Sequence, residues 1–244
     1  MLVEQWCQRL LGYPEEVWAE FCRRNDPLGG LMTPPGYLEA YLRCSEDGWA
    51  TARSVGEGSA ARGGSGGPCD PEALLRARGV RVESRREDGR FLPDPGEGPF
   101  EYALFVEPDE VVVFEDSAEL AQSLVDDGGL SSLLGHVCVR DVLLAHELFH
   151  VICRGDGSRP CRQPVARTRG IGFLRRQTTL SSLEEVSAMS FARELCGLGF
   201  NANALSVLML VPERPQRAQA VMAALDRISG DLRPDWALGT SRVE

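Results

Sequence analysis

The sequence predicts an α+β domain, in which a small antiparallel or mixed sheet packs against a strongly apolar helix. Three observations lead to this prediction. Residues 80–84, 102–106 and 111–114 have the alternation or the β-branched and aromatic content of strands, and a turn of Glu-Pro-Asp-Glu favours pairing of the last two as a hairpin. Residues 137–153 are apolar on nearly every side, which is typical of a helix inside a domain. Residues 182–196 form a second strong helix that ends at glycines.

Length and composition are those of a globular protein. The chain has 244 residues, of which 43% are hydrophobic and 25% are charged, so wholesale disorder is excluded. Its longest apolar stretches, Val142–Ala145 and Val207–Val211, fall far short of the roughly 18 residues that span a bilayer. The first residues lack the basic and apolar regions of a secretory signal. We therefore expect a cytoplasmic protein without a membrane partner.

The domain organisation follows from breaks in the pattern. Residues 1–50 are expected to form an N-terminal helical segment, with a break near Gly12-Tyr13-Pro14. Residues 51–70 include a stretch rich in glycine and serine and predict a flexible linker or loop. Residues 71–244 would form the main domain, beginning with a short helix capped by Asp70 and closing with helices over 202–211 and 215–229.

Charge excludes one class of partner and leaves one question open. The formal net charge of −10 argues against direct nucleic-acid binding, because neutralisation of phosphates supplies most non-specific affinity. The segment from Arg154 to Arg176 is nevertheless strongly basic, with seven arginines and a single acid. It is either a solvated surface loop or the border of a cleft that selects acidic substrates.

Eight cysteines are spread along the chain without a C-x-x-C pair. The chain is not small and shows no export signal, so a disulfide framework is not expected. We interpret the cysteines as reduced and mostly buried, with Cys138, Cys153 and Cys196 inside apolar helical stretches.

The residues with the clearest chemistry are His146-Glu147-Leu148-Phe149-His150, an H-E-x-x-H motif on the apolar helix. Residues four apart lie on one helical face, so both imidazoles can bind one metal ion. Glu147 would lie beside the metal without binding it and would accept a proton from an activated water. The alternative is two core histidines hydrogen-bonded to the backbone. The metal interpretation satisfies several buried polar groups together.

The third ligand is expected downstream of His150. No histidine follows that residue, so a set of three histidines is excluded. The available carboxylates are those of Asp156, Glu184, Glu185 and Glu194. Asp156 follows the helix-ending Gly155 and is expected to point away from the two histidines.

Glu184 and Glu185 open the second strong helix, where a capping role is the alternative to metal binding. Ser181-x-x-Glu184 and Ser182-x-x-Glu185 both match the capping box, but only one pair can form the cap. If Glu184 belongs to the cap, Glu185 heads a stripe of small and apolar residues that suits close approach of another helix. A carboxylate in that position needs a cation or a hydrogen-bond donor.

The second helix also carries a family resemblance. Its segment E-V-S-A-M-S-F-A-R-E-L, which starts at Glu185, resembles the E-x-x-A-N-x-F-A-x-E-L signature of the ImmA/IrrE family of bacterial zinc metallopeptidases. In that family the signature follows an A-H-E-x-x-H helix, and here Ala145 precedes His146. Met189 stands where the signature has Asn, and Cys196-Gly197 replaces the L-M-P that often follows.

The resemblance implies a zincin-like metallopeptidase domain that binds one zinc ion. It implies His146, His150 and Glu185 as metal ligands and Glu147 as the general base. It further implies a zinc metalloendopeptidase that makes a limited cut in a regulatory protein, often a transcriptional repressor. The alternative is a non-catalytic zinc-binding regulator or interaction module. An intact Glu147 favours the enzyme, because a purely structural site has no use for it. An extended substrate is expected to add to a sheet edge near Val111–Phe114.

Overall fold

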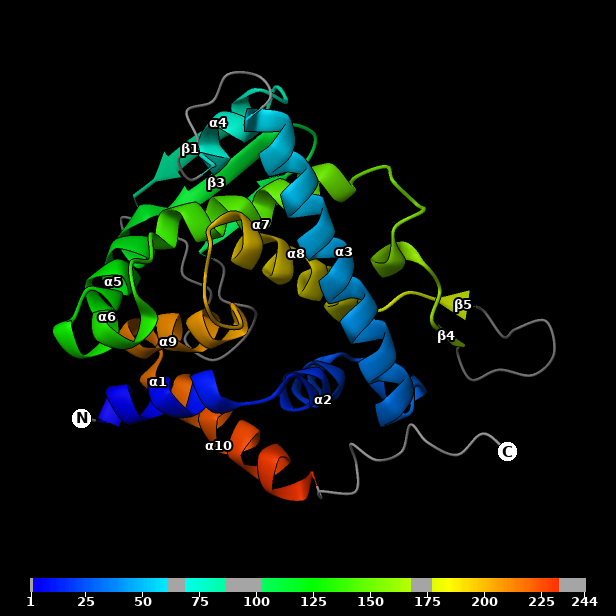
Figure 1. Ribbon diagram of the computed structural model, residues 1–244, viewed down its shortest axis with the longest axis vertical. Helices are drawn as coiled ribbons and strands as arrows, with labels where there is room; N and C mark the ends of the chain where they lie inside the picture. Colours follow the sequence, from blue (N-terminus) through cyan, green and yellow to red (C-terminus); the bar gives the residue numbers. More distant parts are fainter. Residues whose placement is uncertain (1, 61–68, 87–101, 168–176, 233–244) are drawn as a thin grey trace.

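The computed structural model describes residues 2–60, 69–86, 102–167 and 177–232 (Figure 1). The described elements are α1 (Leu2–Gly12), α2 (Glu15–Asn25), η1 (Gly29–Leu31), α3 (Pro34–Ala60), α4 (Pro71–Arg76), β1 (Arg81–Arg85), β2 (Ala103–Val106), β3 (Glu110–Phe114), α5 (Glu115–Val125), α6 (Gly128–Leu134), α7 (Val139–Cys153), η2 (Pro160–Arg162), β4 (Ala166–Arg167), β5 (Gln177–Thr178), α8 (Ser181–Leu195), α9 (Asn203–Glu213) and α10 (Pro215–Asp231). The predicted α+β class is confirmed, and most expected helices are present. The short α6 was not expected from the sequence.

A three-stranded mixed sheet lies at one end of the molecule, beside α4 (Figure 1). The expected hairpin is formed, because β2 pairs antiparallel with β3, and β1 pairs parallel with β3 on the other side. β3 is therefore the central strand, with Val111, Val112 and Val113 buried. The expectation of a free edge at Val111–Phe114 is wrong, because β1 covers that edge. Among the described strands, β1 and β2 form the two edges of this sheet.

Helix α7 lies at the centre of the molecule, between the sheet and α8 (Figure 1). Most of its apolar side chains are buried, as expected from a helix that is apolar on nearly every side, and Leu143, Val151 and Ile152 are partly buried. Phe149 contacts Phe191 of α8 with the ring centroids 5.6 Å apart. Gly155 has a φ of 78°, and this left-handed backbone conformation, which glycine adopts without strain, turns the chain away at the end of the helix.

Helix α3 corrects the expected domain boundary. Residues 51–60, predicted as the start of a flexible linker, continue this helix to Ala60; residues 61–68 lie outside the described part of the chain. Tertiary contacts offset the poor helix propensity of the glycines and serines. Ala52 is buried in the core, while Arg53 stacks on Trp49 and binds Glu194 of α8 at 3.0 Å.

The N-terminal helices belong to the same core as the rest of the chain. Trp6, Trp18 and Tyr37 are buried in one hydrophobic cluster with residues of α7 and α8. The expected helical character of residues 1–50 is confirmed, including the break between α1 and α2. These helices share the core of the main domain and help to position α8.

The cysteines are free thiols, as expected, and burial varies among them. Cys153 is buried, whereas Cys138 and Cys196 are only partly so. In the described part of the chain no single helix has both the length and the hydropathy to cross a bilayer, although α6 and α7, bent by 45°, meet the criterion as a pair.

The contact between α3 and α8 depends on Gly48. A Cβ atom at this position would lie 2.1 Å from the backbone oxygen of Ser187, which is far inside van der Waals contact. Ser187 in turn donates a hydrogen bond of 2.9 Å from its hydroxyl to the backbone oxygen of Cys44. The two helix backbones therefore approach each other closely at this point.

We predict that Gly48→Ala destabilises the protein by about 1–3 kcal/mol, the usual cost of overpacking. The matched control is Gly56→Ala on the same helix, where the nearest atom to an added Cβ is Cys69 Sγ at 4.0 Å. That control should be neutral or stabilising by up to about 1 kcal/mol, because alanine favours a helix over glycine. Urea unfolding followed by circular dichroism measures the free energy of unfolding of both variants. Equal effects from the two substitutions would contradict the close approach.

Candidate metal centre

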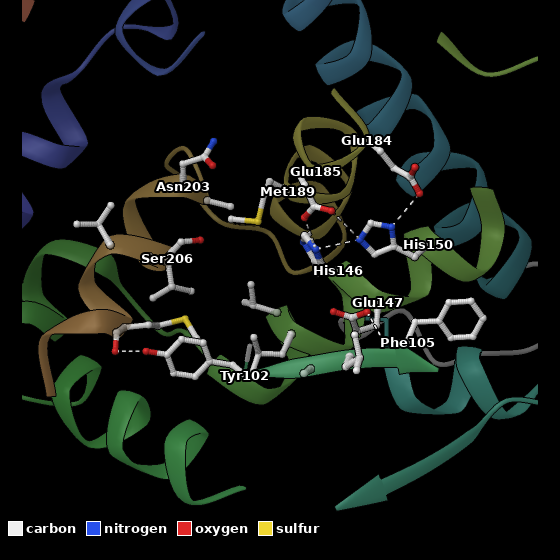
Figure 2. A pocket seen from close by; sticks show the side chains of 18 of the residues that line it. Tyr102, Phe105, His146, Glu147, His150, Glu184, Glu185, Met189, Asn203 and Ser206 are labelled. Atoms are coloured by element: carbon white, nitrogen blue, oxygen red, sulfur yellow. Dashed lines mark hydrogen bonds and ion pairs between the residues drawn. The ribbon is translucent and has the colours of Figure 1, made fainter. Parts of the chain in front are cut away.

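Two imidazoles of α7 face each other on the side of the helix that meets α8 (Figure 2). His146 and His150 are one turn apart, and their Nε2 atoms are separated by 3.1 Å. The rings lie at 66° to each other, with centroids 4.9 Å apart. The helical spacing of four residues thus brings both Nε2 atoms to the same point, as the sequence predicted.

Glu185, the fifth residue of α8, completes a group of three potential ligands. Its Oε2 lies 3.1 Å from His146 Nε2, and its Oε1 lies 3.6 Å from His150 Nε2. Two ligands bound tetrahedrally to zinc at roughly 2.0–2.1 Å are about 3.3 Å apart. The three atoms therefore have the spacing that one zinc ion requires, and two imidazoles with a carboxylate are a donor set that zinc prefers.

Glu184 contacts the ring nitrogen of His150 that does not face Glu185. Its Oε1 lies 3.0 Å from His150 Nδ1 (Figure 2). The same oxygen lies 2.8 Å from Arg162 Nη2. A neutral His150 with its proton on Nδ1 donates to Glu184 and directs the Nε2 lone pair toward Glu185. A carboxylate in this position fixes the ring and raises the basicity of the ligand. Sequence reasoning missed this role and offered capping for Glu184 instead.

The capping boxes that the sequence suggested are not formed. No side chain within the first turn caps α8; instead Asp26 Oδ2 accepts hydrogen bonds from the backbone N–H and the hydroxyl of Ser182, at 3.1 and 2.6 Å. Asp26 lies at the end of α2, far away in the sequence. Because this carboxylate satisfies the N-terminus of the helix, Glu184 and Glu185 are both directed toward α7.

The charges of the cluster favour a bound cation. Burial lowers the pKa of His150, but the hydrogen bond to Glu184 and the charges of Glu185 and Glu147 outweigh it and raise that pKa to about 9. Partial burial raises the pKa of Glu185, yet His146 and His150 lower it to about 2. Three carboxylates thus surround two imidazoles, so the cluster attracts either protons or a divalent ion.

Glu147 lies beside this cluster but faces the sheet. Its side chain is 7% exposed, and its Oε2 accepts a hydrogen bond of 2.8 Å from the backbone N–H of Phe105 on β2 (Figure 2). Burial raises the pKa of this carboxyl group, and both histidines oppose the shift. A raised pKa suits a group that takes up and releases a proton near neutral pH. The hydrogen bond to Phe105 could not be inferred from the sequence, because it joins two separate elements.

The cluster opens into a cavity of about 830 Å³. Glu147, His146, His150 and Glu185 line it together with the outer edge strand β2 and apolar residues of α7 and α9. Of the residues that the structure describes, Arg154, Arg162 and Arg217 also line it. Tyr102 lines it as well, but its hydroxyl donates to the backbone oxygen of Met209.

The arginines of the basic segment from Arg154 to Arg176 differ in what they contact. Arg154 and Arg162 border the cavity, as the cleft interpretation expects, whereas Arg159 binds Asp47 of α3 at 3.2 Å. Both bordering arginines already have partners, since Arg154 donates to the backbone oxygen of Pro108 and Arg162 binds Glu184. Residues 168–176 lie outside the described part of the chain. A preference for acidic substrates stays a prediction.

The other candidate ligands lie elsewhere. Asp156 accepts hydrogen bonds from the backbone and hydroxyl of Ser158, at 3.1 and 2.5 Å, and is directed away from the histidines, as expected. Glu194 binds Arg53 near the far end of α8. His136 is exposed in the loop ahead of α7. Within the described residues, the carboxylate that joins the two histidines is that of Glu185.

Comparison with known proteins adds no relative, because no family model, no curated protein and no solved structure matches this chain. The case for the site therefore depends on its own geometry.

We predict that Glu185→Gln weakens zinc binding more strongly than Glu184→Gln. The first substitution removes a charged ligand, and the second only the hydrogen-bonded partner of His150, which typically costs 10–100-fold in affinity. Competition with a chromophoric chelator gives the dissociation constants. Glu194→Gln on the same helix removes the same charge far from the cluster and should leave zinc affinity unchanged. Equal losses in all three variants would contradict the assignment of Glu185.

Proposed function

We propose that this protein is a zinc-dependent metallopeptidase that hydrolyses a peptide bond in a regulatory protein of the cytoplasm. The observation that carries the proposal is the position of Glu147. Its nearly buried carboxylate has a raised pKa and lies next to a group of two imidazoles and one carboxylate, at the wall of a large cavity. A site that only bound metal would not need a second, non-ligating carboxylate there.

Each residue has a distinct task in the proposed reaction. His146, His150 and Glu185 would hold the zinc ion, and Glu184 keeps His150 in the tautomer that leaves Nε2 free to bind it. When bound, zinc supplies Lewis-acid chemistry, which activates water and polarises a carbonyl group. Glu147 accepts the proton of the attacking water and delivers it to the leaving amine. The Phe105 N–H holds one oxygen of Glu147 and so fixes the direction of the carboxylate.

The cavity suits an extended peptide. β2 is an edge strand of the described sheet, and Tyr102, Ala103, Leu104 and Phe105 all line the cavity. A peptide lying beside β2 would pass Glu147, which already accepts a hydrogen bond from this strand. Arg154, Arg162 and Arg217 are the cationic donors at the cavity that suit a developing negative charge on the carbonyl oxygen. The resemblance noted in the sequence favours a limited cut in a repressor.

The second candidate is a non-catalytic zinc-binding regulator of the same fold. Glu184, which binds both His150 and Arg162, favours this candidate to the extent that such partners also stabilise structural metal sites. The two candidates differ in what they require of Glu147, since a structural site retains its function when this carboxylate is neutralised.

We predict that Glu147→Gln lowers kcat by about 10²–10⁴-fold while zinc is still bound. The substitution keeps the shape of the side chain and removes its basicity. Hydrolysis of a fluorogenic peptide library, supplemented with candidate repressor proteins, measures the activity. Zinc content, determined by elemental analysis, must be equal in the two proteins.

Two results would count against the enzyme. Full hydrolytic activity in Glu147→Gln would place the general base elsewhere. A zinc-loaded wild-type protein that cleaves neither the library nor the repressors would favour the non-catalytic regulator. Asp141→Asn, which removes a carboxylate from the first turn of α7 rather than from the motif, is the control for a change of charge on the helix.

A further inference from the structure

Two cysteines lie in contact behind the candidate metal centre. Cys153 is the last residue of α7, and Cys161 lies in η2 after the turn at Gly155. Their Sγ atoms are 3.5 Å apart, and both residues are buried, with 0% and 2% exposure. A disulfide has an S–S distance of about 2.05 Å, so the sulfurs need to approach by roughly 1.5 Å. Rotation of two short side chains can cover that distance.

The environment of Cys153 differs from that of the other cysteines. A hydrogen bond with Cys161 lowers its pKa, burial opposes this, and the nearby Arg162, whose Nε lies 3.4 Å from the sulfur, lowers it further. Burial instead raises the pKa of Cys7, Cys22, Cys44, Cys138 and Cys196. Since the thiolate is the reactive form, Cys153 is the cysteine best suited to attack an oxidant.

A path to the pair exists for a small molecule. Cys161, Arg162 and Glu184 line a second cavity, of about 330 Å³, together with residues of the segment after α2 and of the start of α8. Arg162 is 42% exposed, and its side chain lines both this cavity and the larger one. A peroxide or a small thiol entering here reaches Cys161, and Cys153 lies directly behind it, with its Sγ 3.5 Å from that of Cys161.

We propose that Cys153 and Cys161 form a reversible intramolecular disulfide when the protein meets a peroxide. The Cys153 thiolate attacks one peroxide oxygen, the O–O bond breaks, and a sulfenic acid and hydroxide result. The Cys161 sulfur then attacks the Cys153 sulfur, and its proton leaves with the displaced hydroxide as water. The first hydroxide takes the proton that Cys153 lost on ionisation. Two thiols lose two electrons and two protons, and one peroxide becomes two waters.

The disulfide would act on the metal centre through Arg162. This side chain bridges Cys153 Sγ at 3.4 Å and Glu184 Oε1 at 2.8 Å, and the same oxygen lies 3.0 Å from His150 Nδ1. Oxidation replaces an anionic acceptor with a neutral sulfur, so Arg162 Nε loses its partner. The hold of Glu184 on His150 loosens as a result. This consequence rests on the proposed metal centre, whereas formation of the disulfide does not.

The first test uses the purified, zinc-loaded, full-length protein, fully reduced and then treated with hydrogen peroxide. Free thiols are alkylated after unfolding, and peptides are mapped by mass spectrometry. We expect one cross-link, between Cys153 and Cys161, that dithiothreitol reverses. If both cysteines are alkylated while other cysteines are oxidised, the proposal is overturned. The result does not depend on any peptidase activity.

Variants separate the roles of the two sulfurs. Cys161→Ser should stop Cys153 at the sulfenic acid, which dimedone traps, and Cys69→Ser should form the cross-link as the wild type does. Arg162→Gln keeps both sulfurs and changes an exposed side chain, so it covers the case in which Cys161→Ser does not fold. It should form the cross-link about 10-fold more slowly, because fewer thiolates are present. An unchanged rate would contradict activation by Arg162.

The second test compares the zinc dissociation constants of the reduced and oxidised protein by chelator competition. We expect about 10–100-fold weaker binding after oxidation, the usual effect of losing such an outer partner. In Glu184→Gln the carboxylate that connects Arg162 to His150 is already gone, so oxidation should not change the zinc dissociation constant further. Equal affinities of the reduced and oxidised wild type would overturn the link to the metal centre.

Discussion

The apolar surroundings of α7 are the constraint on which the rest of the structure depends. This helix is buried on nearly every side, yet it carries two imidazoles and a carboxylate within five residues. Buried polar groups without partners cost a few kcal/mol each. Here the partners come from other elements, with Glu184 and Glu185 on α8 and the Phe105 N–H on β2. The hydrogen bonds that build the site therefore also fix α8 and β2 against α7.

The position of α8 is set in turn by the N-terminal helices. α3 approaches it closely at Gly48, and Asp26 binds Ser182 in its first turn. The hydroxyl of Tyr37 on α3 lies 2.7 Å from that of Ser182. Glu185 follows Ser182 by three residues on the same helix, so a small shift of α8 would move it out of reach of the imidazoles. The first 60 residues are thus part of the scaffold of the site, which explains why they share one core with α7 and α8.

The sequence predicted what is local and missed what depends on contacts between distant segments. The spacing of His146 and His150 is enough to place both imidazoles on one helical face. The role of Glu184 was hidden because its sequence context matched a cap, and the residue that satisfies the helix N-terminus, Asp26, precedes it by more than 150 positions. Residues 51–60 have the composition of a linker, but burial of Ala52 and the contacts of Arg53 overrode local propensity.

The order of the strands likewise depends on contacts between segments that are distant in the sequence. The turn between β2 and β3 identified the hairpin, but nothing local showed that β1 would cover the far side of β3. The consequence for function is large, because β3 is covered on both sides while β2, the strand that contacts Glu147, stays at an edge. The pairing that covers the far side of β3 is parallel and joins segments almost 30 residues apart.

The potential metal ligands lie on long helices, whereas Arg162, which contacts them indirectly, lies in a short turn. Helices α7 and α8 supply the three potential ligands, whose relative positions depend on a packed core that changes little without large cost. The outer partner Arg162 comes instead from the short turn of η2, and its side chain is 42% exposed. A chemical change beside Arg162 can therefore alter the hydrogen bonding of His150 without disturbing the core. The arrangement confines adjustment of the candidate metal centre to the short turn of η2, where a small movement is least costly.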